Sequence, residues 1–190
     1  MTAPFSPGLL ARLAGLVGLA VLIQISVVSE VPIFGLSVDL SPLLVVSIGL
    51  LCGAMMGAVA GFALGLLVDL TLLQTLGVSS LIFTIIGYWA GRLREVRDPQ
   101  AALTPLLVGA AGTAAAGIGY TIVEFMLGVD APVSLQLLRQ IVLGVVINSI
   151  VAPAVWALVR RALRGSLPDD PRRRRRRAYT TGGLSPLSRA

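Results

Sequence analysis

Few side chains in this sequence are suited to acid–base chemistry, and the carboxylates of Asp69 and Glu124 are the main ones in or beside its long apolar segments. General acid–base catalysis needs groups that converge on one substrate. No two acids have a close helical spacing within one apolar segment. The sequence therefore predicts that the protein is not an enzyme of this kind.

Other reactive residue types are missing from the sequence. The 190 residues include no histidine and one cysteine, Cys52, and all fifteen basic residues are arginine. This composition excludes Ser-His-Asp and Cys-His sites, histidine or multi-cysteine metal centres, and lysines that bind phosphate or form Schiff bases. Cys52 lies in an apolar stretch, where a lone cysteine acts as a small packing residue. We expect no catalytic residue, no metal and no cofactor.

The segment from Leu40 to Gly91 indicates the class of protein. Its only charged residue is Asp69, and the whole chain is 56% hydrophobic and 13% charged. Helices that are apolar on every face are accommodated by lipid, because the rest of this chain is too small to enclose them. Aromatic residues make up only 5% of the chain, which disfavours a membrane β-barrel. We predict an all-α integral membrane protein folded as a compact bundle.

The distribution of charge predicts the topology of this bundle. Arginines cluster near the N-terminus, at residues 92–97 and after residue 159, whereas acids lie mainly in the loops near residues 29–40 and 124–134. Arginine-rich loops remain in the cytoplasm, so we expect both termini to be cytoplasmic. We predict six transmembrane helices in a domain of residues 1–164, with four helices as the alternative. The predicted spans are residues 9–28, 40–53, 55–70, 78–92, 102–125 and 135–160.

Glycine recurs at every fourth position in part of this segment, at Gly49, Gly53, Gly57, Gly61 and Gly65. Small residues at this spacing let helix backbones approach closely. Four residues turn a helix by about 400°, so five such glycines would wind around one continuous helix. A break between Cys52 and Ala54 predicts instead two short helices packed face to face. The pattern returns in two later spans, at Gly87, Gly91, Gly109, Thr113 and Gly117.

The polar residues at membrane depth have alternative interpretations. Asp69 is either an ordinary helix-end residue at the outer interface or a deeper residue that holds a neighbouring helix through a hydrogen bond or an arginine. Arg139 is a candidate for that arginine. Gln24 and Asn148 are predicted to form hydrogen bonds between helices. Pro153 lies deep inside the last span and predicts a kink.

The C-terminal residues 165–190 have a different composition, rich in arginine, proline and small polar residues, and are predicted to form a disordered cytoplasmic tail. Its arginine run serves either as an orientation signal attracted to anionic lipids or as a docking strip for an acidic partner. Nucleic-acid binding is not expected, because no aromatic residues are interleaved with the arginines for base stacking. The run comprises Arg172, Arg173, Arg174, Arg175, Arg176 and Arg177.

The order of residues between positions 40 and 97 resembles the signature of the MreD family, the small membrane subunit of the bacterial rod-shape machinery. The strings that carry this resemblance are Gly61-Phe62, Gly65-Leu66-Leu67, Asp69-Leu70, Leu76-Gly77, Gly87-Tyr88 and Gly91-Arg92.

This resemblance implies a multi-pass protein of the bacterial inner membrane with a non-enzymatic scaffold role in lateral peptidoglycan synthesis and cell shape. It implies partnership with the bitopic protein MreC, and through it with the MreB filament, RodA and a class B penicillin-binding protein. Family members have a fold similar to the substrate-binding subunits of energy-coupling-factor transporters. The residues expected to carry packing or family-motif roles are Gly57, Gly61, Phe62, Gly65, Leu66, Asp69, Gly77 and Gly87. Arg92 and the six arginines of the tail are expected to contact a partner or lipid.

The alternative function is that of a substrate-binding subunit of a vitamin transporter. The alanine-rich stretch Ala110–Ala116 is compatible with coupling to an ATPase module through small-residue helices. A vitamin pocket needs several converging aromatic and polar side chains. The two tryptophans, Trp89 and Trp156, lie near the inner ends of predicted spans instead, where they are typical of interface anchors.

Overall fold

The computed structural model describes residues 7–30, 39–73, 75–96, 103–128 and 135–164, and these residues form six α-helices without a strand among them. The helices are α1 (Pro7–Glu30), α2 (Ser41–Cys52), α3 (Ala54–Thr71), α4 (Val78–Val96), α5 (Leu103–Met126) and α6 (Leu135–Leu163). Each of the six predicted spans coincides with one of these helices to within a few residues. The predicted tail of residues 165–190, with its arginine run, lies outside the described residues.

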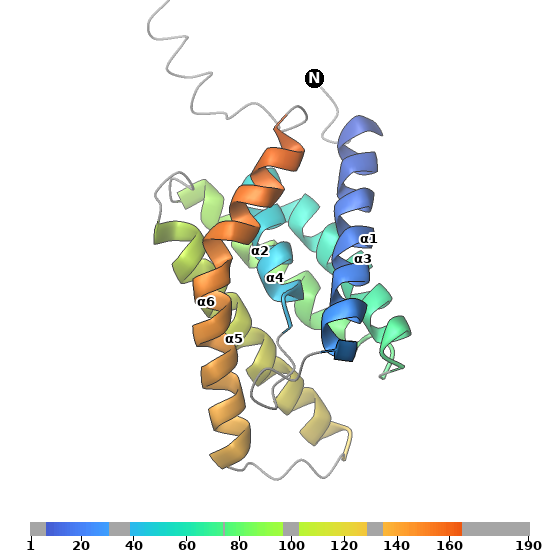
Figure 1. Ribbon diagram of the computed structural model, residues 1–190, viewed down its shortest axis with the longest axis vertical. Coiled ribbons are helices and arrows are strands. Elements are labelled where there is room, and N and C mark those ends of the chain that lie inside the picture. Colours follow the sequence, from blue (N-terminus) through green and yellow to red (C-terminus); the bar gives the residue numbers. More distant parts are fainter. Residues whose placement is uncertain (1–6, 31–38, 74, 97–102, 129–134, 165–190) are drawn as a thin grey trace, which may run out of the picture.

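The helices run alternately up and down, so that α1 begins and α6 ends at the same end of the bundle (Figure 1). We call this end the arginine end, because it carries Arg12, Arg92, Arg94, Arg160, Arg161 and Arg164. Asp69 and Glu124 lie in the last turns of α3 and α5, at the opposite end, which we call the carboxylate end. The segregation of charge that the sequence predicts is therefore present in the fold, apart from Glu95 in the last turn of α4 and Arg139 near the start of α6.

Three of the helices are long and apolar enough to cross a membrane, within the part of the chain that the structure describes. These segments are Ala54–Thr71, Thr104–Met126 and Leu137–Leu163, and the shorter apolar segments are Pro7–Leu22 and Ser41–Cys52. Large apolar side chains cover the outer surface of the bundle, among them Leu138, Val142, Val146 and Ile150 along one side of α6. Apolar helices with apolar outer surfaces fit an integral membrane protein.

α2 is the central helix, and every residue from Ser41 to Cys52 is buried. It contacts each of the other five helices, which its uniformly apolar sequence favours. Pro42 lies in the first turn, where the missing N–H costs nothing. The Ser41 N–H is satisfied by Asp39 Oδ1 at 2.8 Å. The start of α2 thus lies within one residue of the start of the predicted span 40–53.

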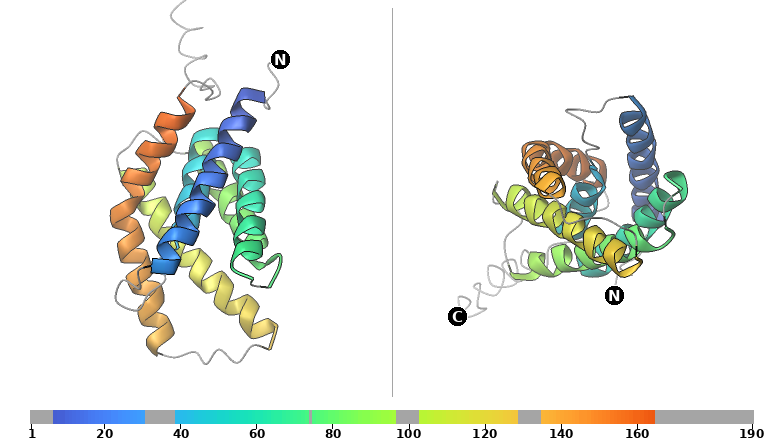
Figure 2. Two further views of the ribbon diagram at one scale, coloured as in Figure 1. Left: turned by 45° about the vertical axis from the view of Figure 1, so that its right-hand side comes forward. Right: turned by 90° about the horizontal axis from the view of Figure 1, so that it is seen from below.

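The break between α2 and α3 occurs at Gly53, whose φ of 97° and ψ of 175° end one helix and begin the next. This backbone conformation favours glycine, since an added Cβ strains it. The predicted pair of short helices in place of one continuous helix is confirmed. A second predicted irregularity, Pro153, lies inside α6, and α6 changes direction in its second half (Figures 1 and 2).

Candidate functional site

Three glycines on one face of α3 bring its backbone against the backbone of α4. A Cβ added at Gly61 would lie well inside 3.0 Å of the Phe83 carbonyl, and one at Gly65 would meet the backbone of Ser79 and Ser80 equally closely. At Gly57 the added atom would meet the Gly87 carbonyl oxygen. Each four-residue step along α3 is matched by a step back of three or four residues along α4, so the two helices pack antiparallel without intervening side chains.

α2 joins this contact through glycine as well. A Cβ at Gly49 would lie 2.7 Å from the Gly87 carbonyl oxygen, and one at Gly87 would collide with the carbonyl of Gly57 and lie 2.9 Å from a Val45 methyl. Gly91 faces the backbone of Gly53 and Ala54 in the same way. The close approach of α2, α3 and α4 occurs at six of the glycines singled out in the sequence, namely Gly49, Gly57, Gly61, Gly65, Gly87 and Gly91. We call these three helices the inner unit.

The glycines of α5 make a different kind of contact. Cβ atoms at Gly109, Gly112 and Gly117 would meet the ends of side chains, namely those of Leu43, Val46 and Ile141. Side chains move aside more readily than backbone does. The similar spacing in the fifth predicted span therefore corresponds to looser packing than that between α3 and α4.

Asp69 is fully buried at the carboxylate end of α3. Its Oδ2 accepts a hydrogen bond from the Gly77 N–H at 2.7 Å, and its Oδ1 accepts one from the Ser79 N–H at 3.3 Å. Both donors belong to the start of α4, where backbone N–H groups lack partners within the helix and the helix dipole favours negative charge. Asp69 therefore forms the hydrogen bond to a neighbouring helix that was one of the alternatives from the sequence. The donors are backbone N–H groups, where the sequence had suggested Arg139 as a partner.

Gly77 has a role that differs from helix packing. Its φ is 97°, and an added Cβ would meet nothing within 4 Å. The left-handed backbone conformation needs glycine for conformational reasons, and it presents the Gly77 N–H to Asp69. Gly77 therefore belongs with Asp69, as part of the link between α3 and α4.

Tyr120 extends this link to α5. Its hydroxyl donates to Ser79 Oγ at 2.5 Å, and its ring packs edge-on against Phe83 with 6.2 Å between centroids. Ser79 is fully buried, so its backbone N–H and its hydroxyl both serve as connections, one to α3 and one to α5. Sequence analysis did not identify Ser79 or Tyr120. The only local signal was the serine pair at the start of a predicted helix.

Asn148 connects α6 to the same half of the bundle. Its Nδ2 donates to the Asp39 carbonyl oxygen at 2.8 Å and to Thr113 Oγ1 at 3.1 Å, and its side chain is buried. The predicted hydrogen bond between helices at Asn148 is confirmed, and its partners are new. We call Asp39, Asp69, Ser79, Thr113, Tyr120 and Asn148 the polar layer.

The hydroxyl of Tyr120 is expected to contribute modestly to stability. Tyr120→Phe removes one hydrogen bond between helices, so we expect the free energy of unfolding to fall by about 1 kcal/mol. Thermal unfolding in detergent would measure this change. Tyr88→Phe is the matched control, because Tyr88 is exposed on α4; equal effects of the two substitutions would contradict a structural role for the Tyr120–Ser79 bond.

The remaining residues singled out in the sequence lie on the outside of the bundle. Phe62 and Leu66 face outward from α3, with 55% and 37% of their surfaces exposed. Arg92 is exposed on α4 at the arginine end. Trp89 is also exposed, whereas the Trp156 ring lies beneath the Arg160 guanidinium, whose Cζ is 4.9 Å from its centroid. The structure thus separates Gly57, Gly61, Gly65, Gly87 and Asp69, which lie between helices, from Phe62, Leu66 and Arg92, whose side chains are exposed.

The chemistry of the polar layer is that of holding helices. Its hydrogen bonds join side chains of one helix to side chains or backbone of another helix or of the residues beside it. Within the described residues, no three His, Cys, Asp or Glu side chains lie close enough together to hold a metal ion. The arrangement is suited to fixing how α3, α4, α5 and α6 lie against α2.

The family model for the rod shape-determining protein MreD matches residues 9–162. No curated protein and no solved structure matches the chain. The matched range includes all of the inner unit and the polar layer, together with the strings of residues that suggested this family from the sequence. This protein belongs to the MreD family and has a role in rod-shape determination.

Proposed function

We propose that this protein is a non-enzymatic scaffold subunit of the bacterial rod-shape machinery and supports lateral peptidoglycan synthesis. The observation that carries the proposal is that the buried polar side chains form hydrogen bonds between helices. Asp69, Ser79, Tyr120 and Asn148 are engaged in bonds between helices. A rigid bundle that presents a defined outer surface is what a scaffold requires, and the family match supplies the cellular process.

We further propose that all six helices cross the bacterial inner membrane, with the arginine end in the cytoplasm. The positive-inside rule supports this orientation. α2 has 12 residues, fewer than the roughly 20 that span a bilayer. α2 is buried within the bundle, so protein rather than lipid surrounds its end at Gly53. Irregular backbone is tolerated at membrane depth in such a setting, and α2 and α3 can therefore both belong to a bundle that crosses the membrane. We also propose that the fold is similar to that of the substrate-binding subunits of energy-coupling-factor transporters.

The proposed partners follow from the family. An MreC-like bitopic protein is the direct partner, and it links the bundle to an MreB filament, RodA and a class B penicillin-binding protein. The outward positions of Phe62 and Leu66 on α3 support a contact with a transmembrane helix of such a partner. Arg92 and residues Arg172 to Arg177 are proposed to contact the cytoplasmic partner or anionic lipids.

Depletion of the protein in its own bacterium tests the proposal. We expect rounded or widened cells, with new wall material no longer confined to its normal sites, as seen by fluorescent labelling of peptidoglycan synthesis. Re-expression of the wild-type chain should restore cell width, and this is the control. Normal shape combined with growth that fails only when a vitamin is scarce would overturn the scaffold proposal in favour of the transporter alternative.

A further inference from the structure

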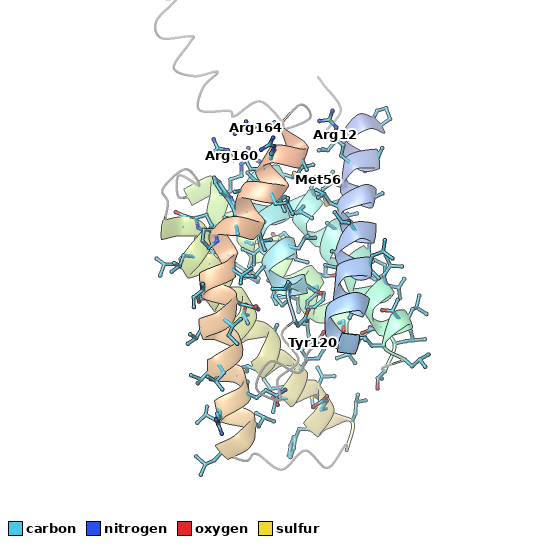
Figure 3. The ribbon with its side chains drawn as sticks, in the orientation of Figure 1. Arg12, Met56, Tyr120, Arg160 and Arg164 are labelled. Carbon is cyan, nitrogen blue, oxygen red and sulfur yellow. The ribbon has the colours of Figure 1, made fainter. Side chains whose placement is uncertain are left out.

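Arginines from the first and last helices lie together at the arginine end. Arg12 is on α1, and Arg160 and Arg164 are four residues apart at the end of α6, so the latter two share one side of the helix. Figure 3 shows all three at the same end of the bundle, with Tyr120 toward the other end. We call Arg12, Arg160 and Arg164 the arginine seam.

The two helices that carry the seam are held in place by apolar packing. α1 and α6 contact each other, and residues that adjoin the three arginines are buried, namely Leu9, Leu13, Val159 and Leu163. Arg12 and Arg164 are themselves exposed, and Arg160 is partly buried. The packing therefore fixes the backbone at the seam, while its guanidinium groups remain at the edge of the bundle.

Arg160 is further restrained by an aromatic ring. Its Cζ lies 4.9 Å from the centroid of Trp156, one turn earlier on α6. A guanidinium over an indole is attracted to the face of the ring, and a restrained arginine loses less side-chain entropy when it binds a ligand. The planar donors of arginine match the oxygens of a phosphate.

Positive charge predominates at the arginine end. Among the described residues of this end, six are arginine and one, Glu95 in the last turn of α4, is acidic, whereas Asp39, Asp69 and Glu124 belong to the carboxylate end. Below the seam, Gly15 lies one turn deeper than Arg12 on α1, and a Cβ added there would meet nothing within 4 Å. The exposed side chains of Leu19 and Leu22 continue this open surface along α1, so the arginines lie at the end of an exposed apolar surface.

We propose that the arginine seam binds the phosphate of an anionic phospholipid, with an acyl chain lying along α1 past Gly15. This inference rests on the proposed membrane orientation and goes beyond it, because it assigns a lipid site to three residues of the folded bundle. Basic pockets between helices on the cytoplasmic side are the usual setting for such lipids. The proposed site is separate from the arginine run of residues 172–177, which belongs to the tail.

Lipid titration of the full chain tests this site. The purified protein in zwitterionic detergent would be mixed with phosphatidylglycerol, and the bound lipid counted by native mass spectrometry. We expect the variant with Arg12→Gln, Arg160→Gln and Arg164→Gln to bind at least about tenfold more weakly than wild type, since each arginine near the membrane surface contributes about fivefold. The control is Arg139→Gln, compared with the Arg12→Gln single variant. Arg139 is exposed near the start of α6, at the carboxylate end, so its loss should leave phosphatidylglycerol binding as in wild type.

Four results would overturn the proposal. Equal weakening of binding by Arg12→Gln and Arg139→Gln would indicate diffuse attraction to charge. Equal binding of phosphatidylcholine would remove the role of the anionic headgroup, and displacement by millimolar inorganic phosphate would indicate a site for free anions. The Arg12→Gln single variant serves if the triple variant does not fold, and unaltered binding by that variant and by Arg164→Gln would also overturn the site. This experiment measures lipid binding and not cell shape. A negative result would therefore overturn the lipid site without contradicting the scaffold proposal, which the depletion experiment tests separately.

Discussion

Gly61→Ala is expected to lower the free energy of unfolding by about 3 kcal/mol, at the upper end of what overpacking a core costs. The added methyl would collide with the backbone carbonyl of Phe83 on α4. Backbone cannot rotate away as a side chain does, so α3 and α4 would have to separate. Their separation would also strain the neighbouring contact of Gly57 with Gly87. Thermal unfolding in detergent measures the loss, and a failure to restore cell width in depleted cells would accompany it.

Gly144→Ala is the control for this substitution. Gly144 lies on α6, and a Cβ added there would meet nothing within 4 Å. Because alanine favours the helix by up to about 1 kcal/mol relative to glycine, Gly144→Ala should leave stability unchanged or raise it slightly. Similar stabilities for Gly61→Ala and Gly144→Ala would show that α3 and α4 do not depend on backbone contact at Gly61.

Gly112→Ala gives a graded comparison on α5. The nearest atom to an added Cβ is a methyl of Val46 at 2.6 Å, which is as close as several of the contacts on α3. Since that methyl belongs to a side chain, its rotation should relieve most of the collision. We expect Gly112→Ala to lose less stability than Gly61→Ala, although an added Cβ would meet another atom closely at both glycines.

Asp69→Ala is expected to lower the free energy of unfolding by about 2 kcal/mol, because it removes the acceptor of two N–H groups at the start of α4, and the donor residue Ser79 is buried. These donors are the backbone N–H groups of Gly77 and Ser79. Asp69→Asn retains one acceptor oxygen, so its loss should be about half as large. The same order should appear in the ability of each variant to restore rod shape.

The exposed Glu124 provides the control for Asp69. Glu124→Ala removes a carboxylate from the same end of the bundle and should change stability by no more than about 0.5 kcal/mol. Equal stability and equal cell shape with aspartate, asparagine and alanine at position 69 would contradict the structural role. A loss with asparagine as large as that with alanine would show that negative charge, rather than hydrogen bonding, is what α4 requires.

Much of the fold follows from local sequence. Helix number and approximate bounds depend on runs of apolar residues and on the residues that interrupt them, such as Pro42 and Gly53. The family could be recognised from residues 40–97, because the motif glycines and Asp69 have a distinctive spacing. These features depend on residues a few positions apart, so they can be read without knowing which helices touch.

The partners of the buried polar groups depend on contacts that local sequence does not reveal. Tyr120 bonds to a serine 41 residues away, and Asn148 bonds to the carbonyl of a residue 109 positions earlier. The outward orientation of Phe62 and Leu66, within the same motif as the buried Gly61 and Gly65, likewise depends on which face of α3 meets α4.

The sequence by itself therefore determined that this is a helical membrane protein of the MreD family with closely packed glycines, because composition, helix breaks and motif spacing are local properties. Only the tertiary structure decided that those glycines meet backbone, that Asp69 holds the start of α4, and that α1, which carries Arg12, contacts α6, which carries Arg160 and Arg164. These pairings depend on the register and crossing of helices, which are set when all six pack together.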